Sequence, residues 1–303
     1  MKNKIENTRV KQIGNIILQN LVPQAIQIIQ DECHDLTIIK KVGYDGVKPD
    51  LATNGDRKAQ EMYMREIAKH FPDFGIIAEE DGVAFDGKDN GEDGEKGEDI
   101  YFTIDPLDGT KAYERGAGQG VGTMIALCKD NDVIAAYIGD ANTGETYGFA
   151  DMEKRGAAIR QRFGVTTNLK PRTDKPLAEQ YVLLREMPRK QPELINKMIN
   201  DITAGGLFKD AEVTGGSIGT AFARLWKGEV GAMVLQPGFN TPWDLAPTLG
   251  ISRRLGYKFF KLLDGKLIEN EPMLTKTVVE KPYTEIVVHE AHEKELMEWL
   301  KVN

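Results

Sequence analysis

The periodicity of apolar residues changes near Val165, and this change constrains the fold more than any other feature of the chain. Before it, apolar runs of strand length are separated by turn-forming clusters such as Lys129–Asp132 and Asp140–Gly144. This pattern predicts an antiparallel meander with helices on one face. The predicted strands are Gly75–Ala78, Tyr101–Ile104, Gly120–Cys128, Val133–Gly139 and Glu145–Ala150.

After Val165, strand-like and helix-like segments alternate, which is typical of an α/β layer. We therefore expect an α+β half over residues 1–165 and an α/β half over residues 166–303. The predicted elements of the second half are strands at Tyr181–Leu184, near Glu212, at Gly231–Leu235 and at Glu285–His289, and helices at Glu193–Ile202, Ile218–Lys227, Asp244–Leu255 and the C-terminus.

Two helices are expected in the first half. Residues 4–30 have apolar side chains at helical spacing, and Pro23 should kink or divide that helix. A second helix should run from about Gly55 to His70, capped by Thr53 or Asn54.

Charge and cysteine content narrow the class of protein. A net charge of -8 over 303 residues argues against binding a nucleic-acid polymer, which would require a basic surface. Met1–Arg9 lacks the apolar core of a signal peptide, and no run is long enough to span a membrane. Cys33 and Cys128 have no metal-site spacing and are expected to be separate thiols, which indicates a cytoplasmic protein. The histidines are scattered, so a zinc site is not expected.

The run Asp105-Pro-Leu-Asp108-Gly109-Thr110 places two carboxylates three residues apart at the end of a predicted strand. Carboxylates that are close together repel, and a divalent cation relieves that repulsion. Oxygen ligands without nearby thiols favour Mg²⁺, which commonly bridges carboxylates and a substrate phosphate. The alternative is a surface turn, because Asp, Pro and Gly are common turn residues. Pro106 stands where a haloacid-dehalogenase-type phosphatase needs its nucleophilic Asp, so aspartyl-phosphate chemistry is not expected.

Two further segments place acids at the ends of elements. Glu79 follows the predicted strand Gly75–Ala78, and Asp244 lies at the start of a predicted helix in Thr241–Pro247. If these acids converge with Asp105 and Asp108, they could share two or three Mg²⁺ ions, lower the pKa of a bound water and neutralise phosphate charge. The residues alone thus predict metal-assisted hydrolysis of a phosphate ester.

With these segments in order, the chain resembles the inositol monophosphatase family, whose members carry Glu-Glu, then Asp-Pro-(Ile/Leu)-Asp-Gly-Thr, then Trp-Asp-x-Ala. The segment Lys48–Asp56 also resembles the family's Lys…Asp-Leu-Val-Thr-x-x-Asp. The resemblance covers the chain from about Lys48 to the last helix. It implies a layered α-β-α-β-α fold with the active site between the halves, Mg²⁺ with Mn²⁺ as a substitute, a homodimer and sensitivity to lithium.

The resemblance also implies roles for individual residues. Glu79, Asp105 and the Leu107 carbonyl would hold one ion; Asp105, Asp108 and Asp244 a second; and Glu79 would help hold a third. Thr110 would orient the attacking water, with Asp56 hydrogen-bonded behind it. Substrate contacts would come from Asp108, Gly109, Thr110, Gly216 and Ser217.

Several of these positions have alternative interpretations. Gly109 and Thr110 should open a short helix and let the phosphate approach the backbone. Ser217 could instead be an ordinary helix N-cap. Trp243 is expected to pack in the core rather than contact substrate. Glu80 and Asp81 could support the site, but solvated acids are the simpler expectation.

The motifs restrict the identity of the substrate less than they restrict the type of reaction. Inositol-preferring members place a Glu seven residues before the Trp-Asp acid, and Pro237 stands there in this chain. Lys111 and Arg115 resemble the Lys-x-Phe-x-Arg-Gly of the branch that removes the 3′-phosphate of adenosine 3′,5′-bisphosphate, although the usual Glu-Ala-Gly-Gly segment of both branches is missing. These two residues could bind the substrate through a second phosphate, or simply cover the helix end. A phosphatase of fructose 1,6-bisphosphate and a catalytically silent, metal-binding relative remain alternatives.

The segment Asp81–Asp99 holds eight acids and two lysines. Its spacing fails for an EF-hand calcium loop. We expect a solvated connection between two metal motifs, with gating or loose metal capture as the alternative.

Overall fold

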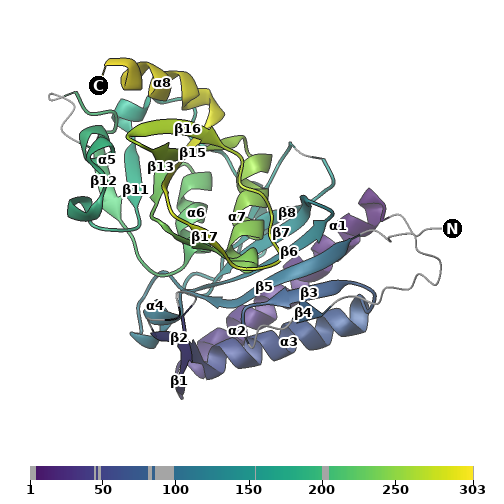
Figure 1. Ribbon diagram of the computed structural model, residues 1–303. Helices are drawn as coiled ribbons and strands as arrows, with labels where there is room; N and C mark the ends of the chain where they lie inside the picture. The colour runs from purple at the N-terminus through teal and green to yellow at the C-terminus, as the bar shows by residue number, and fades with distance from the viewer. Residues whose placement is uncertain are drawn as a thin grey trace.

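The computed structural model describes residues 5–43, 46, 49–80, 84–85, 99–153, 155–199 and 205–302, without the side chains of residues 49, 84 and 85. Two large sheets alternate with layers of helices (Figure 1). Lys48, Asp81 and all of the acidic segment except residues 84, 85 and 99 lie outside the described residues.

The N-terminal helical segment is interrupted as Pro23 predicts. It consists of α1 (Asn7–Ile16), a π-helical turn (Ile17–Leu21) and α2 (Val22–Glu32). Pro23 has no N–H to donate to the carbonyl four residues earlier, and the backbone widens just before it, where Val22 N donates to Ile17 O. The expected interruption is therefore confirmed.

Helix α3 (Asn54–His70) begins with a reciprocal cap. Asp56 N donates to Thr53 Oγ1 at 3.4 Å, and Thr53 N donates to Asp56 Oδ2 at 2.7 Å. Thr53, rather than Asn54, is the cap, and this arrangement fixes the fully buried Asp56 at the start of the helix.

The first sheet has the strand order β10-β9-β8-β7-β6-β5-β3-β4. The expected meander is confirmed from β5 onward, where all neighbours are antiparallel, but β3 and β5 pair in parallel. The sequence prediction omitted the edge strands and a separate β1–β2 hairpin. The strands are β1 (Ile38–Val42), β2 (Pro49–Thr53), β3 (Gly75–Ala78), β4 (Ala84–Phe85), β5 (Ile100–Asp108), β6 (Gly122–Lys129), β7 (Asp132–Asp140), β8 (Thr146–Ala150), β9 (Ile159–Arg162) and β10 (Val165–Asn168).

The second sheet has the order β12-β11-β13-β18-β15-β16, and β14 pairs with β17 in a separate ribbon. The four predicted strands are present, whereas the hairpin β15–β16 was not expected. The strands are β11 (Tyr181–Leu184), β12 (Asp210–Val213), β13 (Ala232–Leu235), β14 (Gly238–Asn240), β15 (Tyr257–Leu263), β16 (Lys266–Asn270), β17 (Val279–Lys281) and β18 (Thr284–His289).

The remaining helices complete the layers. They are α4 (Thr110–Glu114), α5 (Glu193–Met198), α6 (Ile218–Trp226), α7 (Pro242–Arg254) and α8 (Glu293–Val302), with 3₁₀ turns at Leu177–Glu179, Pro188–Lys190 and Glu290–His292. Helices α6 and α7 lie between the sheets, because α7 contacts β6, β7 and β15, and α6 contacts β6, β7 and β13. The first sheet is thus covered on both faces, not on one face as expected from the meander alone.

Buried apolar side chains connect the layers. Trp226, Leu249 and Met233 belong to one core cluster between the sheets, and Leu296 of α8 packs on the other side of the second sheet. The order helix, sheet, helix, sheet, helix confirms the α-β-α-β-α architecture (Figure 1). Within the described part of the chain, no helix combines the length and apolar character needed to cross a membrane.

Candidate active site

Three carboxylates from distant parts of the sequence meet between the two halves of the chain. Oxygens of Asp105, Asp108 and Asp244 all lie within 4.8 Å of one another. Asp105 and Asp108 are 3% and 6% exposed. The sequence prediction that these acids converge is consistent with this geometry.

A bulge in β5 explains how Asp105 and Asp108 can face the same point. In a regular strand, residues three apart point to opposite faces of the sheet. Asp105 pairs with Met124 and Asp108 with Gly122, so β5 contains one more residue than β6 between these pairs. The extra residue brings both carboxylates to one side. The strand therefore does not end at Ile104, as the sequence suggested, but continues through a bulge.

The third acid is positioned by the start of α7. Thr241 is the N-cap, and Asp244 N donates to its hydroxyl at 3.3 Å. Asp244 lies in the first helical turn, where the helix dipole favours a negative charge. Trp243 beside it is 7% exposed and belongs to the core, as expected, although it also borders the pocket described below.

The start of α6 holds the Asp108 carboxylate. Ile218 N donates to Oδ1 at 3.0 Å, Gly219 N donates to Oδ2 at 2.7 Å, and the Ser217 hydroxyl also donates to Oδ2. Ser217 is fully buried and accepts a hydrogen bond from Thr220 N, so the N-cap interpretation is confirmed. In this arrangement Ser217 contacts Asp108, whereas Gly216 lines the pocket.

The carboxylates are electrostatically strained. Burial and their mutual repulsion raise the pKa of Asp105 well above its ordinary value, burial raises the pKa of Asp108, and burial and Asp108 raise the pKa of Asp244 to about 6. Asp105 Oδ1 is buried and has no hydrogen-bond partner among the described residues. An unpartnered buried oxygen within a set of carboxylate oxygens fits a hard divalent cation such as Mg²⁺.

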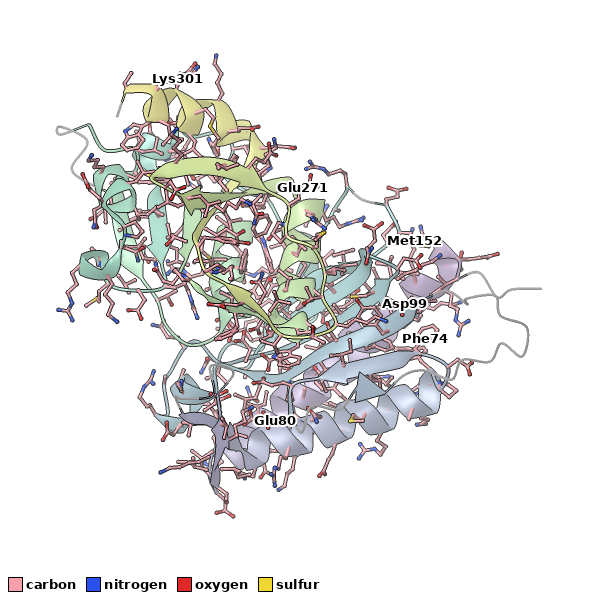
Figure 2. All side chains as sticks on the ribbon, in the orientation of Figure 1. Phe74, Glu80, Asp99, Met152, Glu271 and Lys301 are labelled. Carbon is pink, nitrogen blue, oxygen red and sulfur yellow. The ribbon has the colours of Figure 1, made fainter. Side chains whose placement is uncertain are left out.

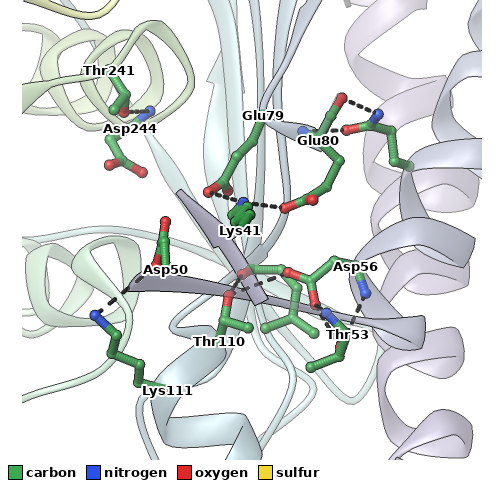
Figure 3. A network of polar contacts seen from close by, with 12 residues as sticks. Lys41, Asp50, Thr53, Asp56, Glu79, Glu80, Thr110, Lys111, Thr241 and Asp244 are labelled. Atoms are coloured by element: carbon green, nitrogen blue, oxygen red, sulfur yellow. Dashed lines mark hydrogen bonds and ion pairs between the residues drawn. The ribbon is translucent and has the colours of Figure 1, made fainter. Parts of the chain in front are cut away.

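Glu79 lies near this group but is held by a lysine. Lys41 Nζ is 3.2 Å from Glu79 Oε1 and 2.6 Å from Glu80 Oε1 (Figure 3). Burial raises the pKa of Glu79 to about 8, although Lys41 opposes the shift. Glu79 lines the same pocket as the three aspartates without belonging to their compact group.

The expectation that Glu80 is a solvated acid is wrong. Glu80 is 3% exposed, its N–H donates to Gln60 Oε1 at 2.9 Å, and its carbonyl accepts from Gln60 Nε2 at 2.7 Å. Figure 2 shows Phe74 and Glu80 at opposite ends of β3. Lys41 was not predicted to belong to the site, and the sequence Ile38-Ile39-Lys40-Lys41-Val42 gives no signal for it, because the alternation that turns Ile39 and Lys41 inward appears only in the folded strand.

Thr110 and Asp56 are connected as the family resemblance implied. The Thr110 hydroxyl lies 3.2 Å from Asp56 Oδ1 and 3.2 Å from the Leu107 carbonyl oxygen (Figure 3). Burial raises the pKa of Asp56 to about 6. The hydroxyl hydrogen is directed to these acceptors, so a Thr110 oxygen lone pair remains for a molecule in the pocket.

Gly109 supports this turn through a close backbone approach. Its φ is +95°, and a Cβ placed there would lie 2.3 Å from Gly120 O and 2.7 Å from Ser217 N. Glycine is therefore required at this position, as expected. The reason is the close approach of the Gly120 and Ser217 backbone, whereas the expected reason was the approach of a phosphate.

A pocket of about 360 Å³ contains most of these groups. Lys111 lines it and lies 4.0 Å from Asp50, whereas Arg115 is the exposed C-cap residue of α4 and is not brought to it. The lining residues are Asp50, Glu79, Asp105, Leu107, Asp108, Gly109, Thr110, Lys111, Arg185, Gly216, Ile218, Trp243 and Asp244. Arg185, which follows the predicted strand Tyr181–Leu184, was not predicted to belong to the site. A larger cavity of about 650 Å³ borders the other end of α7 and contains none of the motif acids.

The raised pKa values predict that the metal-free protein loses stability as pH rises. An unfolded Asp or Glu titrates near pH ~4, whereas the folded pKa is about 6 for Asp244 and about 8 for Glu79. Between these values the folded state holds more protons than the unfolded state, so stability falls as pH rises from about 4 to about 8. Thermal unfolding in EDTA should show this slope, and Asp244→Asn should reduce it. An unchanged slope in the variant would contradict this assignment.

Comparison with known proteins gives one family. A model of the inositol monophosphatase family matches residues 11–301. Nus factor SuhB from Xylella fastidiosa is 27% identical over 149 residues, or 49% of this chain and 44% of that protein. Human 3′(2′),5′-bisphosphate nucleotidase 1 is 30% identical over 151 residues, or 41% of this chain and 48% of that protein. The chain spans about half the length of these curated relatives.

A solved structure extends the likeness to nearly the whole chain. The extragenic suppressor protein suhB from Bartonella henselae superposes with a TM-score of 0.69 at 19% identity, covering 96% of this chain and 98% of that chain. At this identity the likeness establishes the fold, and it agrees with the layered architecture.

Proposed function

The chain belongs to the inositol monophosphatase family, and from its site we propose that it hydrolyses a small phosphate ester with the aid of Mg²⁺. The observation that carries this proposal is the convergence of three carboxylates, from β5 and α7, in a pocket that also contains Thr110. A surface turn would not bury these acids or leave Asp105 Oδ1 without a partner.

Five groups of this chain would hold the metal. We assign Asp105, Asp108 and Asp244 to it first, and Glu79 and the Leu107 carbonyl next, because all five residues line one pocket. When bound, Mg²⁺ supplies charge neutralisation for the phosphate and the leaving oxygen and lowers the pKa of a water. Lys41 must exchange its contact with Glu79 for another if Glu79 becomes a ligand.

Thr110 and Asp56 are proposed to place the attacking water. Because the Thr110 hydroxyl hydrogen is directed to Asp56 or Leu107, its oxygen can accept a hydrogen bond from water in the pocket. That bond orients a lone pair of the water for in-line attack on phosphorus. Asp56 thus acts through Thr110. Gly109 and Gly216 line the pocket and border the space that remains for the phosphate ester.

Thr110→Val should reduce kcat by about 100-fold, because it removes the hydroxyl that orients water while keeping the side-chain shape. Thr110→Ser keeps the hydroxyl and should retain most of the activity. Metal affinity from calorimetry should stay close to wild type in both variants. Equal turnover by the Val and Ser variants would exclude this role for Thr110.

The substrate is proposed to be a small phosphorylated metabolite, either adenosine 3′,5′-bisphosphate or an inositol monophosphate. Lys111 at the pocket favours an additional negative charge on the substrate, whereas Arg115 does not line the pocket. Mn²⁺ as a substitute ion, lithium inhibition, a homodimer and a cytoplasmic location are further proposals that rest on the family resemblance.

The test is phosphate release with Mg²⁺ from adenosine 3′,5′-bisphosphate, inositol 1-phosphate and fructose 1,6-bisphosphate, each with an EDTA control. Metal-dependent release from the first or second supports the proposal. A preference for fructose 1,6-bisphosphate would establish the alternative sugar phosphatase. Metal binding without release from any of a broad set of esters would favour the silent relative.

A further inference from the structure

Arg185 is a charged residue of the pocket to which the proposed hydrolysis gives no role. It directly follows β11, and its side chain reaches the backbone before α6. Nη1 donates to Ser217 O at 3.1 Å, and Nη2 donates to Gly216 O. Arg185 is one of the residues that line the pocket of the three carboxylates.

The positive charge of Arg185 has no direct ionic partner within the described ranges. The two acceptors of its hydrogen bonds are backbone carbonyls, and its attraction to Asp108 and Asp244 acts without an ion-pair contact. Burial lowers the pKa of Arg185, although an arginine remains charged at neutral pH. Because the two acids are proposed metal ligands, bound cations would cancel the attraction that they offer. The loaded site would then contain a half-buried cation without an anion.

The position of Arg185 relates it to one end of the substrate. Gly109 and Thr110 border the pocket from the first half of the chain, next to the carboxylates. Arg185, Gly216 and Trp243 border it from the second half. If the reacting phosphate lies at the carboxylates, two walls are open to the alcohol half of the ester: this one, and the first-half wall that contains Asp50 and Lys111.

Among the second-half residues that line the pocket, Asp244 is the one with a side-chain acceptor for a sugar hydroxyl, and it is a proposed metal ligand. Neither Pro237 nor Gln236, which lie between β13 and β14, lines the pocket. Gln236 instead donates to Gln191 Oε1 at 2.6 Å. A guanidinium offers five N–H donors, of which two are used here, so its chemistry favours an oxyanion over a hydroxyl.

We propose that Arg185 is a specificity-determining residue that recognises a second anionic group, phosphate or carboxylate, on the alcohol half of the ester. This inference rests on the proposed function. Lys111, the other cation of the lining, is not equivalent, because it is largely exposed and lies beside Asp50.

The test compares matched esters that differ only in the second group. Adenosine 3′,5′-bisphosphate is paired with adenosine 3′-phosphate, and 3-phosphoglycerate with glycerol 3-phosphate. Wild type should show kcat/KM about 10- to 100-fold higher for the anionic member of at least one pair, the range expected for a charge-assisted hydrogen bond. A preference within the adenosine pair would identify phosphate as the recognised group, and a preference within the glycerate pair would identify carboxylate.

Arg185→Gln should abolish most of this preference by raising KM for the member that carries the second anionic group. Its kcat on the member that lacks this group should change less than that KM. Arg185→Lys should restore part of the preference, because it keeps the charge. Arg189→Gln is the matched control: it removes the same charge from an exposed residue of the neighbouring 3₁₀ turn that does not line the pocket. Thermal unfolding of each variant reports any loss of the contacts to Gly216 and Ser217.

Three results would overturn the inference, and they are distinguishable. Equal wild-type activity on both members of each pair would refute it while leaving the proposed hydrolysis intact, and this comparison needs no variant. Equal losses on both members in Arg185→Gln would assign Arg185 a purely structural role. If no ester is hydrolysed with Mg²⁺, the proposed function fails and the inference fails with it.

Discussion

Asp105→Asn is expected to abolish Mg²⁺-dependent phosphate release while leaving the fold intact. Asp105 belongs to the group of three carboxylates and has a buried oxygen without a partner. Metal stabilisation of the reacting phosphate contributes several kcal/mol, so removing this ligand should reduce turnover by about 1,000-fold or more. Because repulsion between acids is relieved, the metal-free variant should melt at or above the temperature of the metal-free wild type.

The measurement combines phosphate release with thermal unfolding, both with Mg²⁺ and with EDTA. Wild type should be stabilised by Mg²⁺ and the variant much less. Asp99→Asn is the matched control, because Asp99 is exposed, pairs with Lys276 at 2.7 Å and lies outside the pocket (Figure 2). Near-normal turnover by Asp105→Asn would remove Asp105 from the site.

Gly109→Ala is expected to destabilise the protein by about 3 kcal/mol or more. The backbone at Gly109 has a φ of +95°, and the new methyl group would lie 2.3 Å from the Gly120 carbonyl. This neighbour is backbone rather than the end of a flexible side chain, so relief requires moving β6 or the start of α6. Activity should fall together with stability, because the displacement also affects Thr110 and Asp108.

The matched control for this prediction is Gly116→Ala. Gly116 also has a positive φ, +62°, but nothing lies within 4 Å of the added methyl group. This control should show only the cost of the left-handed conformation, about 1 kcal/mol. Chemical denaturation of both variants measures the difference, and equal losses would show that the close approach at Gly109 does not matter.

Local sequence patterns predicted much of this fold. Turn-forming clusters separated the strands β5 to β8, and the periodicity of α3, α6 and α7 identified those helices within a few residues. Pro23 marked the interruption before α2, because the loss of one backbone donor acts locally. The motifs also singled out Asp105, Asp108 and Asp244, the three carboxylates that the structure brings together.

The features that were missed depend on contacts between distant segments. The bulge after Asp105 is defined by its pairing with β6, which Pro106 alone does not reveal. Glu80 looked solvated because its partners, Gln60 and Lys41, lie 20 and 39 residues away in the sequence. Arg185 follows an ordinary strand, and its importance appears only when β11 is placed beside the start of α6.

Anomalous diffraction from crystals grown with Mn²⁺ and phosphate tests the central claim most directly. The account predicts a manganese peak in contact with carboxylate oxygens of Asp105, Asp108 and Asp244, with phosphate next to Thr110. Manganese bound elsewhere, with these three side chains free of metal and phosphate absent from the pocket, would contradict it.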